Sequence, residues 1–421
     1  MSHRHKDRSG WAGLAGLAGL ALALLAACQP ARDTAPEPEP EPPAPLPGTL
    51  AFEPVSWEAL SGWSAADLTA ARQAFLRNCE RRALREAEAP LSTRAEWAGT
   101  VAEWQDACTQ LDAVGAEAGL QAVFEAVFTP VRVVATDPGS ASRADTGLLT
   151  GYYEPFVHVR SAPQGEFTQP LRRRPDDLVT VDLGRFDDSL AGRRIVGEVR
   201  AGELVLYKDR AEIERQDAGE IFAWGRPADV FFLQIQGSGR LVWPDGHQER
   251  AAFAAHNGLP YRSIGRELIE RGELEAHAAS KAGIERWLEE NGPEATAALF
   301  SVNPRYVFFE TQVLDDPSVG PSGASGVALT PMASIAVDPS QHAYGVPVWL
   351  SAELPELGAW SGLVVTQDTG GAITGPLRAD FFWGWGEAAE RRAGSTRAEA
   401  DWVMLLPHTV VARLFAEQDP A

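Results

Sequence analysis

The chain has 421 residues and a mass of 45.3 kDa, more than one ordinary hydrophobic core accommodates, so two domains are expected. Hydrophobic residues make up 45% of the chain and charged residues 23%, a composition that excludes wholesale disorder. The formal net charge is −21, and no cluster of Lys and Arg stands out along the chain. These features argue against a surface that follows nucleic-acid phosphates, so no nucleic acid is expected as a partner.

The amino terminus has the pattern of an export signal. Residues 1–10 contain three basic residues and one acidic residue, and residues 11–27 form an uncharged apolar run. The run ends in LAAC at Cys28, which resembles the bacterial lipobox, whose cysteine becomes the lipidated first residue of the mature protein. Gln29 follows, which in enterobacterial-type sorting implies the outer membrane. The alternative is a transmembrane anchor, although 17 apolar residues are at the short limit for spanning a bilayer.

Residues 29–50 form a linker rich in Pro and Glu that contains PEPEPEPPAPLP. Such a segment offers nothing to a core and favours extended polyproline II, so it is expected to hold a folded body away from a membrane. Removal of residues 1–28 takes away three basic residues and one acidic residue, which leaves the mature chain at −23.

Three helices are predicted in the first folded part of the chain. Apolar residues recur at helical spacing over residues 64–87, with Ser64 as the expected N-cap, and again over 93–114 and 119–128. This region is expected to form a helical segment that precedes the β-rich part.

Two cysteines, Cys79 and Cys108, lie within the first two of these helices. In an oxidising periplasm two otherwise unpaired cysteines are expected to form a disulfide. The alternative is a pair of buried thiols on neighbouring helices.

Beyond Val131 short apolar runs broken by Gly, Pro and Asp predict strands, among them LLTGYYEPFV, RRIVGEV, ELVLY and DVFFLQIQGSGRLVW. Helical patterns return at 263–271 and 280–290, with serine N-caps and a stop at Asn291-Gly292. Strands resume beyond Pro304. The predicted fold class is therefore α+β, mostly β with helices before and within the β-rich region.

Common catalytic templates are absent from the sequence. It has no phosphate-binding loop, dinucleotide fingerprint, HExxH or GxSxG, and its eight His are scattered, so no His-based zinc site or triad is visible. Asp-Thr-Gly occurs at 145–147 and 368–370, which suggests an aspartic protease dyad. Leu148 and Gly371 follow these segments, where that family has Ser or Thr, so a protease is only a minor alternative.

The segment richest in candidate chemistry is residues 362–394. An apolar run ends at Asp368 and glycines follow, and Asp380 is followed directly by FFWGW. A carboxyl group beside several aromatic rings has its ionised form disfavoured, so its pKa rises. Asp380 is therefore a candidate general acid, and a strand-end Asp that caps a turn is the alternative.

This segment resembles the 3D domain, which is named for its aspartates. Four further segments agree in order with the membrane-bound lytic transglycosylase A family of peptidoglycan-cleaving lipoproteins, which the chain as a whole resembles: LLTGYYEP at 148–155, FFLQIQGSGRL at 231–241, NPRYVFFE at 303–310 and GVALTPMASIAVDP at 326–339.

The resemblance implies cleavage of the β-1,4 bond between N-acetylmuramic acid and N-acetylglucosamine without water. The muramic C6 hydroxyl attacks its own anomeric carbon and leaves a 1,6-anhydro end, so a single carboxyl group can act first as acid and then as base. The family's catalytic Asp maps onto Asp380, and Asp368 is expected to support it. Family members often carry a third Asp shortly after the catalytic one, but here Phe381, Phe382 and Trp383 stand in those places. No metal or cofactor is implied.

The resemblance also implies a double-psi β-barrel domain formed by residues 51–157 and 300–421, with a β-rich domain inserted at 158–299 and a substrate groove between them. The residues expected to bind the glycan strand are Thr150, Tyr152, Glu154, Gln234, Gln236, Gly237 and Ser238. The expected location is periplasmic, with a lipid anchor to the outer membrane through Cys28. Protein partners in wall synthesis are not identified.

Two alternative functions remain open. One is a peptidoglycan hydrolase that uses Asp368 and Asp380 as a pair of carboxylates. The other is a lipoprotein that binds the cell wall without cutting it. Glu154 and Glu310 are the spare carboxylates if the scheme with a single acid is wrong.

Overall fold

The computed structural model describes residues 49–115, 119–136, 143–190, 193–216, 218–314 and 316–416, which belong to one compact unit. The predicted signal, Cys28 and nearly all of the predicted linker lie outside the described residues. No helix in these ranges combines the length and the apolar composition needed to cross a membrane.

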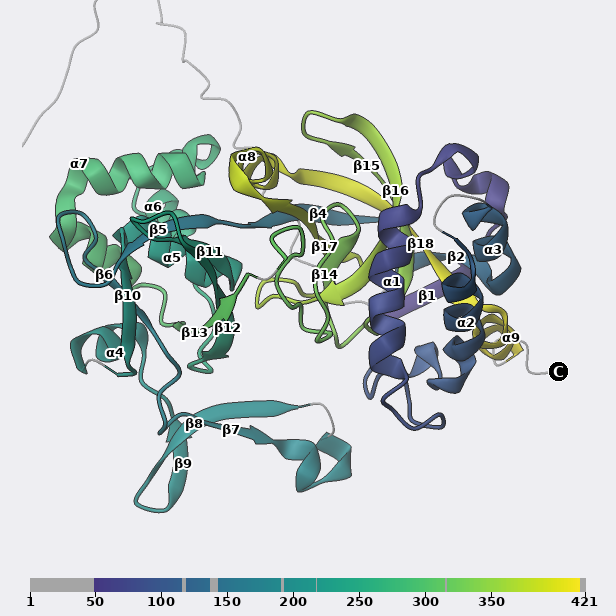
Figure 1. Ribbon diagram of the computed structural model, residues 1–421, viewed down its shortest axis with the longest axis horizontal. Coiled ribbons are helices and arrows are strands. Elements are labelled where there is room, and N and C mark those ends of the chain that lie inside the picture. The colour runs from purple at the N-terminus through teal and green to yellow at the C-terminus, as the bar shows by residue number, and fades with distance from the viewer. Residues whose placement is uncertain are drawn as a thin grey trace, which may run out of the picture. The chain divides into compact units, whose positions relative to one another are not determined.

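Six strands close into a barrel (Figure 1). In ring order they are β18 (Arg397–Pro407), β15 (Pro347–Leu354), β16 (Gly358–Asp368), β14 (Ser334–Val337), β17 (Arg378–Trp385) and β4 (Thr146–Glu154). The ring closes because β4 pairs with β17 and also with β18. The pairs β14–β16 and β17–β4 are parallel, and the other pairs are antiparallel. Closure leaves no unpaired edge within this ring.

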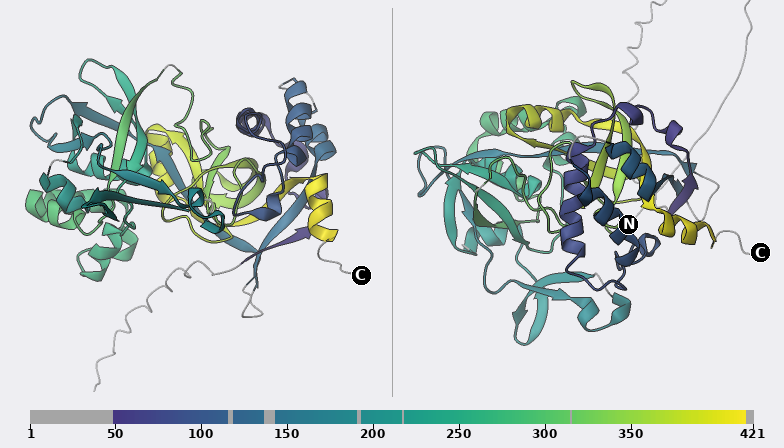
Figure 2. Two further views of the ribbon diagram at one scale, coloured as in Figure 1. Left: turned by 90° about the horizontal axis from the view of Figure 1, so that it is seen from below. Right: turned by 45° about the vertical axis from the view of Figure 1, so that its right-hand side comes forward.

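Further strands and four helices pack against the barrel. The strands that extend the sheet from β18 are β2 (Phe128–Thr136), β1 (Thr49–Pro54) and β3 (Arg143–Ala144). The helices are α1 (Thr69–Arg82), α2 (Gln105–Ala113), α3 (Leu120–Val127) and α9 (His408–Ala416), and they gather on the side away from the second sheet (Figures 1 and 2). One large hydrophobic core joins these helices to the barrel strands.

A second sheet of six strands follows directly from β4. Its order is β13 (Val307–Val313), β12 (Gln248–His256), β11 (Gly239–Val242), β5 (Phe156–Arg160), β10 (Ile221–Gly225) and β6 (Gln169–Arg172). The sheet thus extends past both ends of the predicted insert 158–299, because β5 begins two residues before it and β13 lies beyond it. A separate small sheet contains β7 (Val179–Asp182), β8 (Arg194–Arg200) and β9 (Glu203–Leu206).

The remaining helices belong mostly to this part of the chain. They are α4 (Arg210–Gln216), α5 (Pro227–Gln236), α6 (Ile264–Glu270) and α7 (Lys281–Phe300), with α8 (Gly386–Ser395) after β17. Short 3-10 helices are η1 (Trp57–Ala59), η2 (Trp63–Ala65), η3 (Glu96–Ala98), η4 (Ala102–Trp104), η5 (Leu183–Arg185), η6 (Asp188–Leu190) and η7 (Ala276–Ala278).

The predicted fold class is confirmed, with a closed barrel, a second β-rich part and an N-terminal helical segment. Several helix boundaries differ from the prediction. The first helix starts at Thr69, where Asp67 Oδ1 accepts the Thr69 N–H at 2.9 Å, so Ser64 is not its cap. The second starts only at Gln105. Ser263 and Ser280 cap α6 and α7 as predicted. Gly292 has a non-helical conformation, with φ of 80°, so the first helical stretch of α7 is interrupted at the predicted stop and a second stretch continues to Phe300.

The strand predicted through residues 231–236 is wrong, because this segment is the helix α5. A short apolar run is compatible with either structure, since both a buried strand and a buried helix need apolar residues. Pro227 at the helix start and Gly237 in the left-handed conformation at its end are helix boundary signals that the apolar run obscured.

The predicted disulfide is confirmed. Cys79 in α1 and Cys108 in α2 are bonded, with their Cα atoms 5.6 Å apart. The bond ties together two helices of the large core.

We expect the double variant Cys79→Ala/Cys108→Ala to unfold with a free energy about 3 to 4 kcal/mol lower, because the bond closes a loop of 29 residues in the unfolded chain. Denaturant unfolding measures this difference. Thiol labelling of the denatured wild type without reductant should leave both cysteines unmodified, and labelling of either would contradict the assignment.

Candidate active site

The barrel brings Asp368 and Asp380 onto the two strands that flank β14. Ala336 of β14 pairs with Asp368 in β16 on one side and with Asp380 in β17 on the other. Neighbouring strands are about 4.8 Å apart, so the two Cα atoms are roughly 10 Å apart. Both carboxyl groups therefore lie at one level of the barrel wall.

Alternation along β4 and β17 separates the site from the barrel core. Leu149 and Tyr153 of β4 and Phe381 of β17 belong to the large core. Tyr152 of β4 and Phe382 of β17 belong instead to a separate apolar cluster. Because successive side chains of a strand point to opposite faces, Thr150, Tyr152, Asp380 and Phe382 share the face turned away from the core.

Asp380 is held by a chain of hydrogen bonds. The Thr150 hydroxyl donates to Asp380 Oδ1 at 2.5 Å, and Arg378 Nη2 donates to Thr150 Oγ1 at 2.8 Å. Burial raises the pKa of Asp380, while the Thr150 hydrogen bond and the Arg378 charge act in the opposite direction. Burial thus shifts the carboxyl group toward its protonated form, and the Thr150 hydroxyl is placed to donate to the ionised form.

Asp368 is held by neutral donors. The Tyr152 hydroxyl donates to Oδ2 at 3.1 Å, and the Ala324 N–H donates to Oδ1 at 2.9 Å. Burial raises the pKa of Asp368 to about 6, although these hydrogen bonds lower it, and the nearby Asp380 charge adds to the rise. The two aspartates therefore influence each other.

Apolar side chains surround the pair on the face turned away from the large core. They form the cluster Tyr152, Leu329, Ala336, Ile373 and Phe382. An apolar neighbourhood disfavours carboxylate charge, which accounts for the raised pKa values of both aspartates. Two carboxyl groups with raised pKa values at one site are the pattern expected of acid–base catalysis.

Two family models match segments of this chain. Residues 148–310 match the family described as MltA specific insert domain, and residues 333–406 match the 3D domain. The membrane-bound lytic murein transglycosylase A of Vibrio cholerae is 30% identical over 284 residues, which cover 65% of this chain and 69% of that protein. The chain belongs to the membrane-bound lytic murein transglycosylase A family.

Other members of this family are also similar to the chain in sequence and in structure. The Escherichia coli K12 relative is 35% identical over 257 residues, and the match spans 58% of this chain and 62% of that relative's length. A crystal structure of the transglycosylase from Agrobacterium tumefaciens superposes with a TM-score of 0.72 at 31% identity, covering 86% of this chain and 99% of that one. The Escherichia coli MltA structure with bound chitohexaose has a TM-score of 0.59 at 25% identity and covers 85% and 94%.

Glu154, at the end of β4, is fully buried between two arginines. Arg240 Nε donates to one carboxylate oxygen at 2.8 Å and Arg250 Nε to the other at 2.5 Å. Arg240 also lies over the ring of Trp385, 4.0 Å from its centre. In this structure Glu154 thus connects the barrel to β11 and β12 and is not open to a ligand.

The segment 234–238 is placed differently from the extended strand that was predicted. Gln234 is buried, and its side-chain oxygen accepts a hydrogen bond from Arg210 at 2.5 Å. Gln236 Oε1 accepts the Tyr153 N–H at 3.2 Å, which joins the end of α5 to β4. Gly237 and Ser238 form the half-buried turn into β11. Of these four residues, Gln234 is the one enclosed within the protein.

Arg378 is a site residue that the sequence analysis missed. It lies two residues before Asp380 in a strand, and residues at that spacing share a face, so the spacing could have identified it. Ala324 contributes only its backbone N–H, and nothing in the sequence marks such a donor. Among the described residues, no group of three or more His, Cys, Asp or Glu side chains is arranged to hold a metal ion.

We expect Glu154→Gln to lower the free energy of unfolding by about 3 to 5 kcal/mol, because it leaves two buried arginines without a balancing charge. Glu310→Gln is the matched control, since Glu310 is exposed on β13, and its effect should stay within about 0.5 kcal/mol. Denaturant unfolding of both variants checks this, and equal effects would contradict the role of Glu154.

A second prediction concerns pH. Because the pKa of Asp368 is about 6 in the folded protein, above its value near 3.8, the folded state holds more protons than the unfolded chain between pH 4 and 6. Stability should therefore fall as pH rises through this range, by about 1 to 3 kcal/mol relative to Asp368→Asn. Denaturant unfolding from pH 4 to 8 measures it, and parallel pH profiles for the two proteins would refute the shift.

Proposed function

We propose that this protein is a peptidoglycan lytic transglycosylase that cleaves the MurNAc-β-1,4-GlcNAc bond without water and leaves 1,6-anhydromuramoyl ends. The observation that carries the proposal is the setting of Asp380. Its carboxyl group has a raised pKa, lies on the face turned away from the large core and accepts a hydrogen bond from Thr150. Membership of the lytic transglycosylase A family supports the same reaction.

In the proposed mechanism, Asp380 acts twice. Its neutral carboxyl group protonates the glycosidic oxygen as the bond to the muramic anomeric carbon breaks. The resulting carboxylate, which accepts the Thr150 hydrogen bond, then takes the proton from the muramic C6 hydroxyl as that oxygen bonds to the anomeric carbon. The proton returns to Asp380, so the cycle closes without water.

The proposed role of Asp368 is to support this site. Tyr152 and the Ala324 N–H hold its carboxyl group, and it lies across β14 from Asp380. The E. coli relative has been solved with chitohexaose, which supports a glycan strand as the ligand here. We propose that the strand contacts Thr150, Tyr152, Gln236, Gly237 and Ser238, and that Glu154 and Gln234 position these elements from within.

We also propose that residues 51–157 and 300–421 form the catalytic domain and 158–299 the insert. Removal of residues 1–28 as a signal and lipidation of Cys28 would anchor this protein to the outer membrane from the periplasmic side, with residues 29–50 as the tether. The relatives' description as membrane-bound supports this location.

A hydrolase is the second candidate function, because Asp368 and Asp380 flank the same strand and could act as a pair. The protease alternative loses its basis in the fold. Asp145 is paired with Arg143 and directly precedes β4, five residues before Thr150, which is about 17 Å along an extended chain. A dyad that shares one proton needs its carboxyl groups in contact.

Asp380→Asn should reduce release of anhydromuramoyl products from purified sacculi by about 100-fold or more, because the amide can neither donate nor accept the proton. Asp145→Asn, in the other Asp-Thr-Gly segment, is the control and should retain activity. Mass spectrometry of the products decides between the candidates. Free reducing ends would favour the hydrolase, and lytic activity that survives Asp380→Asn would refute the assignment.

A further inference from the structure

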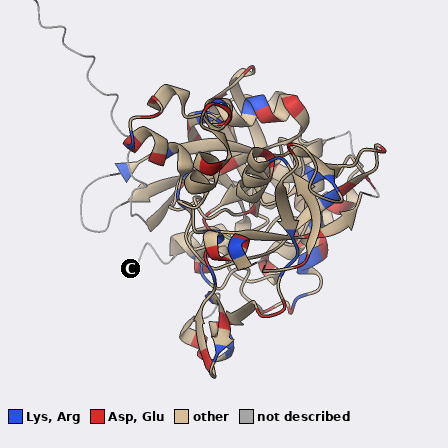
Figure 3. Ribbon diagram, turned by 90° about the vertical axis from the view of Figure 1, so that its left-hand side faces the viewer, with Lys and Arg blue, Asp and Glu red and all other residues tan. Residues whose placement is uncertain are grey.

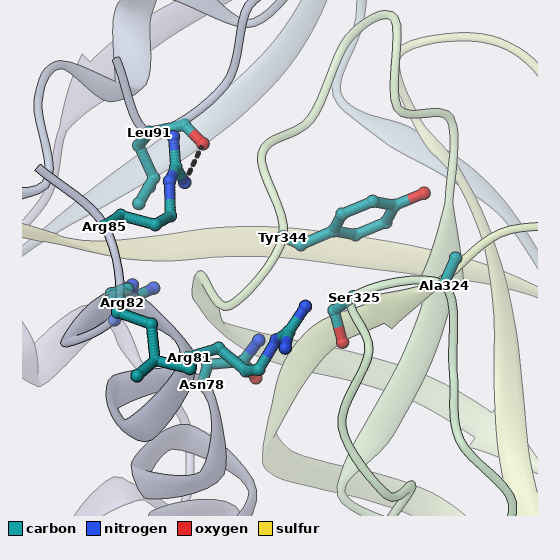
Figure 4. A pocket seen from close by; sticks show the side chains of 9 residues that line it. Asn78, Arg81, Arg82, Arg85, Leu91, Ala324, Ser325 and Tyr344 are labelled. Atoms are coloured by element: carbon teal, nitrogen blue, oxygen red, sulfur yellow. Dashed lines mark hydrogen bonds between the residues drawn. The ribbon is translucent and has the colours of Figure 1, made fainter. Parts of the chain in front are cut away.

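A pocket of about 360 Å³ lies between the C-terminal end of α1 and two loops of the barrel (Figure 4). The α1 side provides Asn78, Arg81, Arg82 and Arg85, and the barrel side provides Ser325 and Tyr344. We call these six residues the arginine pocket. Basic and acidic residues are interspersed over the elements visible in Figure 3. Three arginines around one pocket differ from this mixed distribution of charge.

None of these three arginines has a carboxylate within ion-pair distance among the described residues. Arg82 is buried and donates to the Gly345 carbonyl at 2.6 Å, and Arg85 donates to the carbonyls of Leu91, at 3.0 Å, and Pro90. No hydrogen bond or ion pair of the exposed Arg81 guanidinium is found in the described part of the chain, and Figure 4 shows it directed toward Ser325.

The positive charge of the pocket is incompletely balanced. The C-terminus of α1 contributes roughly half a negative charge, which accounts for a basic residue in a last helical turn but not for three. Burial is the main reason that the pKa of Arg82 is lowered to about 9, and the like charge of the neighbouring Arg85 adds to the shift. A bound anion would remove this repulsion.

The barrel side adds a hydroxyl group without a partner. Ser325 Oγ is buried and has no hydrogen-bond partner, although the Ser325 N–H is fixed by the Gln367 carbonyl at 3.0 Å. Asn78 Oδ1 accepts from Gln367 at 2.5 Å, which leaves the Asn78 NH2 as a further donor. Guanidinium, amide and hydroxyl donors in one pocket suit a carboxylate, whose two oxygens accept several hydrogen bonds.

The arginine pocket adjoins the candidate active site. Ala324, which also lines the cavity, donates its N–H to Asp368 Oδ1 at 2.9 Å. Burial and the Asp368 charge raise the pKa of Tyr344 to about 12, so this ring lies within electrostatic reach of the same aspartate. A ligand bound in the pocket would thus lie next to the loop whose Ala324 N–H holds Asp368.

We propose that the arginine pocket binds a carboxylate of the peptide stem carried by the muramic acid residue of the substrate. This inference rests on the proposed function, because the stem is attached to one of the two sugars at the bond that is cut. An Arg guanidinium recognises a carboxylate through two parallel hydrogen bonds, and Arg81 is the free donor that can do so. The stem then aligns the strand over Asp380.

The test compares two substrates in the full-length protein: glycan strands with their stems, and the same strands after an amidase has removed the stems. Wild type should show a higher kcat/KM on the strands with stems. Arg81→Gln should lower the ratio of the two kcat/KM values about tenfold, mainly through KM, and Ser325→Ala about threefold. Arg266→Gln is the matched control, since Arg266 is exposed on α6, and it should leave the ratio as in wild type.

The outcomes separate the two proposals. If wild type releases anhydro ends but Arg81→Gln leaves the ratio unchanged, the pocket inference fails and the proposed function stands. If wild type cleaves neither substrate, the proposed function fails. The pocket is then decided by calorimetry with an N-acetylmuramyl peptide and its fully amidated form. Equal binding of both forms overturns the inference. It is supported if wild type binds the amidated form more weakly and if this difference in affinity disappears in Arg81→Gln.

Discussion

The pairing of β4 is the constraint on which the rest of the structure depends. This strand closes the barrel between β17 and β18 and then continues into β5 of the second sheet. The same nine residues place Thr150 and Tyr152 beside the aspartates and Glu154 between the arginines of β11 and β12. A slip of one residue would turn Thr150 and Tyr152 into the core, so barrel packing and site geometry are a single requirement.

Gly151 shows how tightly this requirement is met. A Cβ atom there would lie 2.7 Å from Trp383 Nε1, inside the packed side of the barrel wall. The glycine between two site residues therefore reflects the close approach of β4 and β17. Thr150 and Tyr152 can face the aspartates because Gly151, which faces Trp383 on the opposite side of β4, has no side chain to accommodate there.

Three enclosed carboxyl groups have different surroundings and hence different roles. Glu154 is paired with two arginines, which balance its charge within the protein. Asp368 has hydroxyl and backbone N–H donors, and Asp380 has Thr150 backed by Arg378. Their ionised forms are disfavoured, because apolar side chains adjoin them and no cation bonds them directly. Donor type, rather than burial alone, separates the structural carboxylate from the candidate catalytic ones.

The charge of the chain as a whole hides its local distribution. A net charge of −21 argues against attraction to an anionic polymer, yet α1 and the turn after it bring three arginines around one pocket beside Asp368. Long-range repulsion and local anion binding are compatible, because screening limits the first to about 8 Å in physiological salt. The recognition of an anionic stem would then depend on short-range hydrogen bonds.

The positions of the two aspartates, the helical segment, most strands and the disulfide could be predicted because their signals are local: a motif, a hydrophobic period, or two otherwise unpaired cysteines. The helix α5 could not, since a short apolar run carries no decisive period. The partners of Glu154 lie 86 and 96 residues away in the chain, and the Ala324 N–H lies 44 residues from Asp368. No spacing rule connects groups at such separations.

The sequence by itself therefore determined which residues could do acid–base chemistry, because side-chain type and immediate neighbours are enough to mark them. Only the tertiary structure decided which carboxyl groups are neutralised by arginine and which are left with raised pKa values. It also decided that the end of α1 shares a pocket with the loop whose Ala324 N–H donates to Asp368. Electrostatic free energy depends on distance through space, and strand pairing sets that distance independently of separation along the chain.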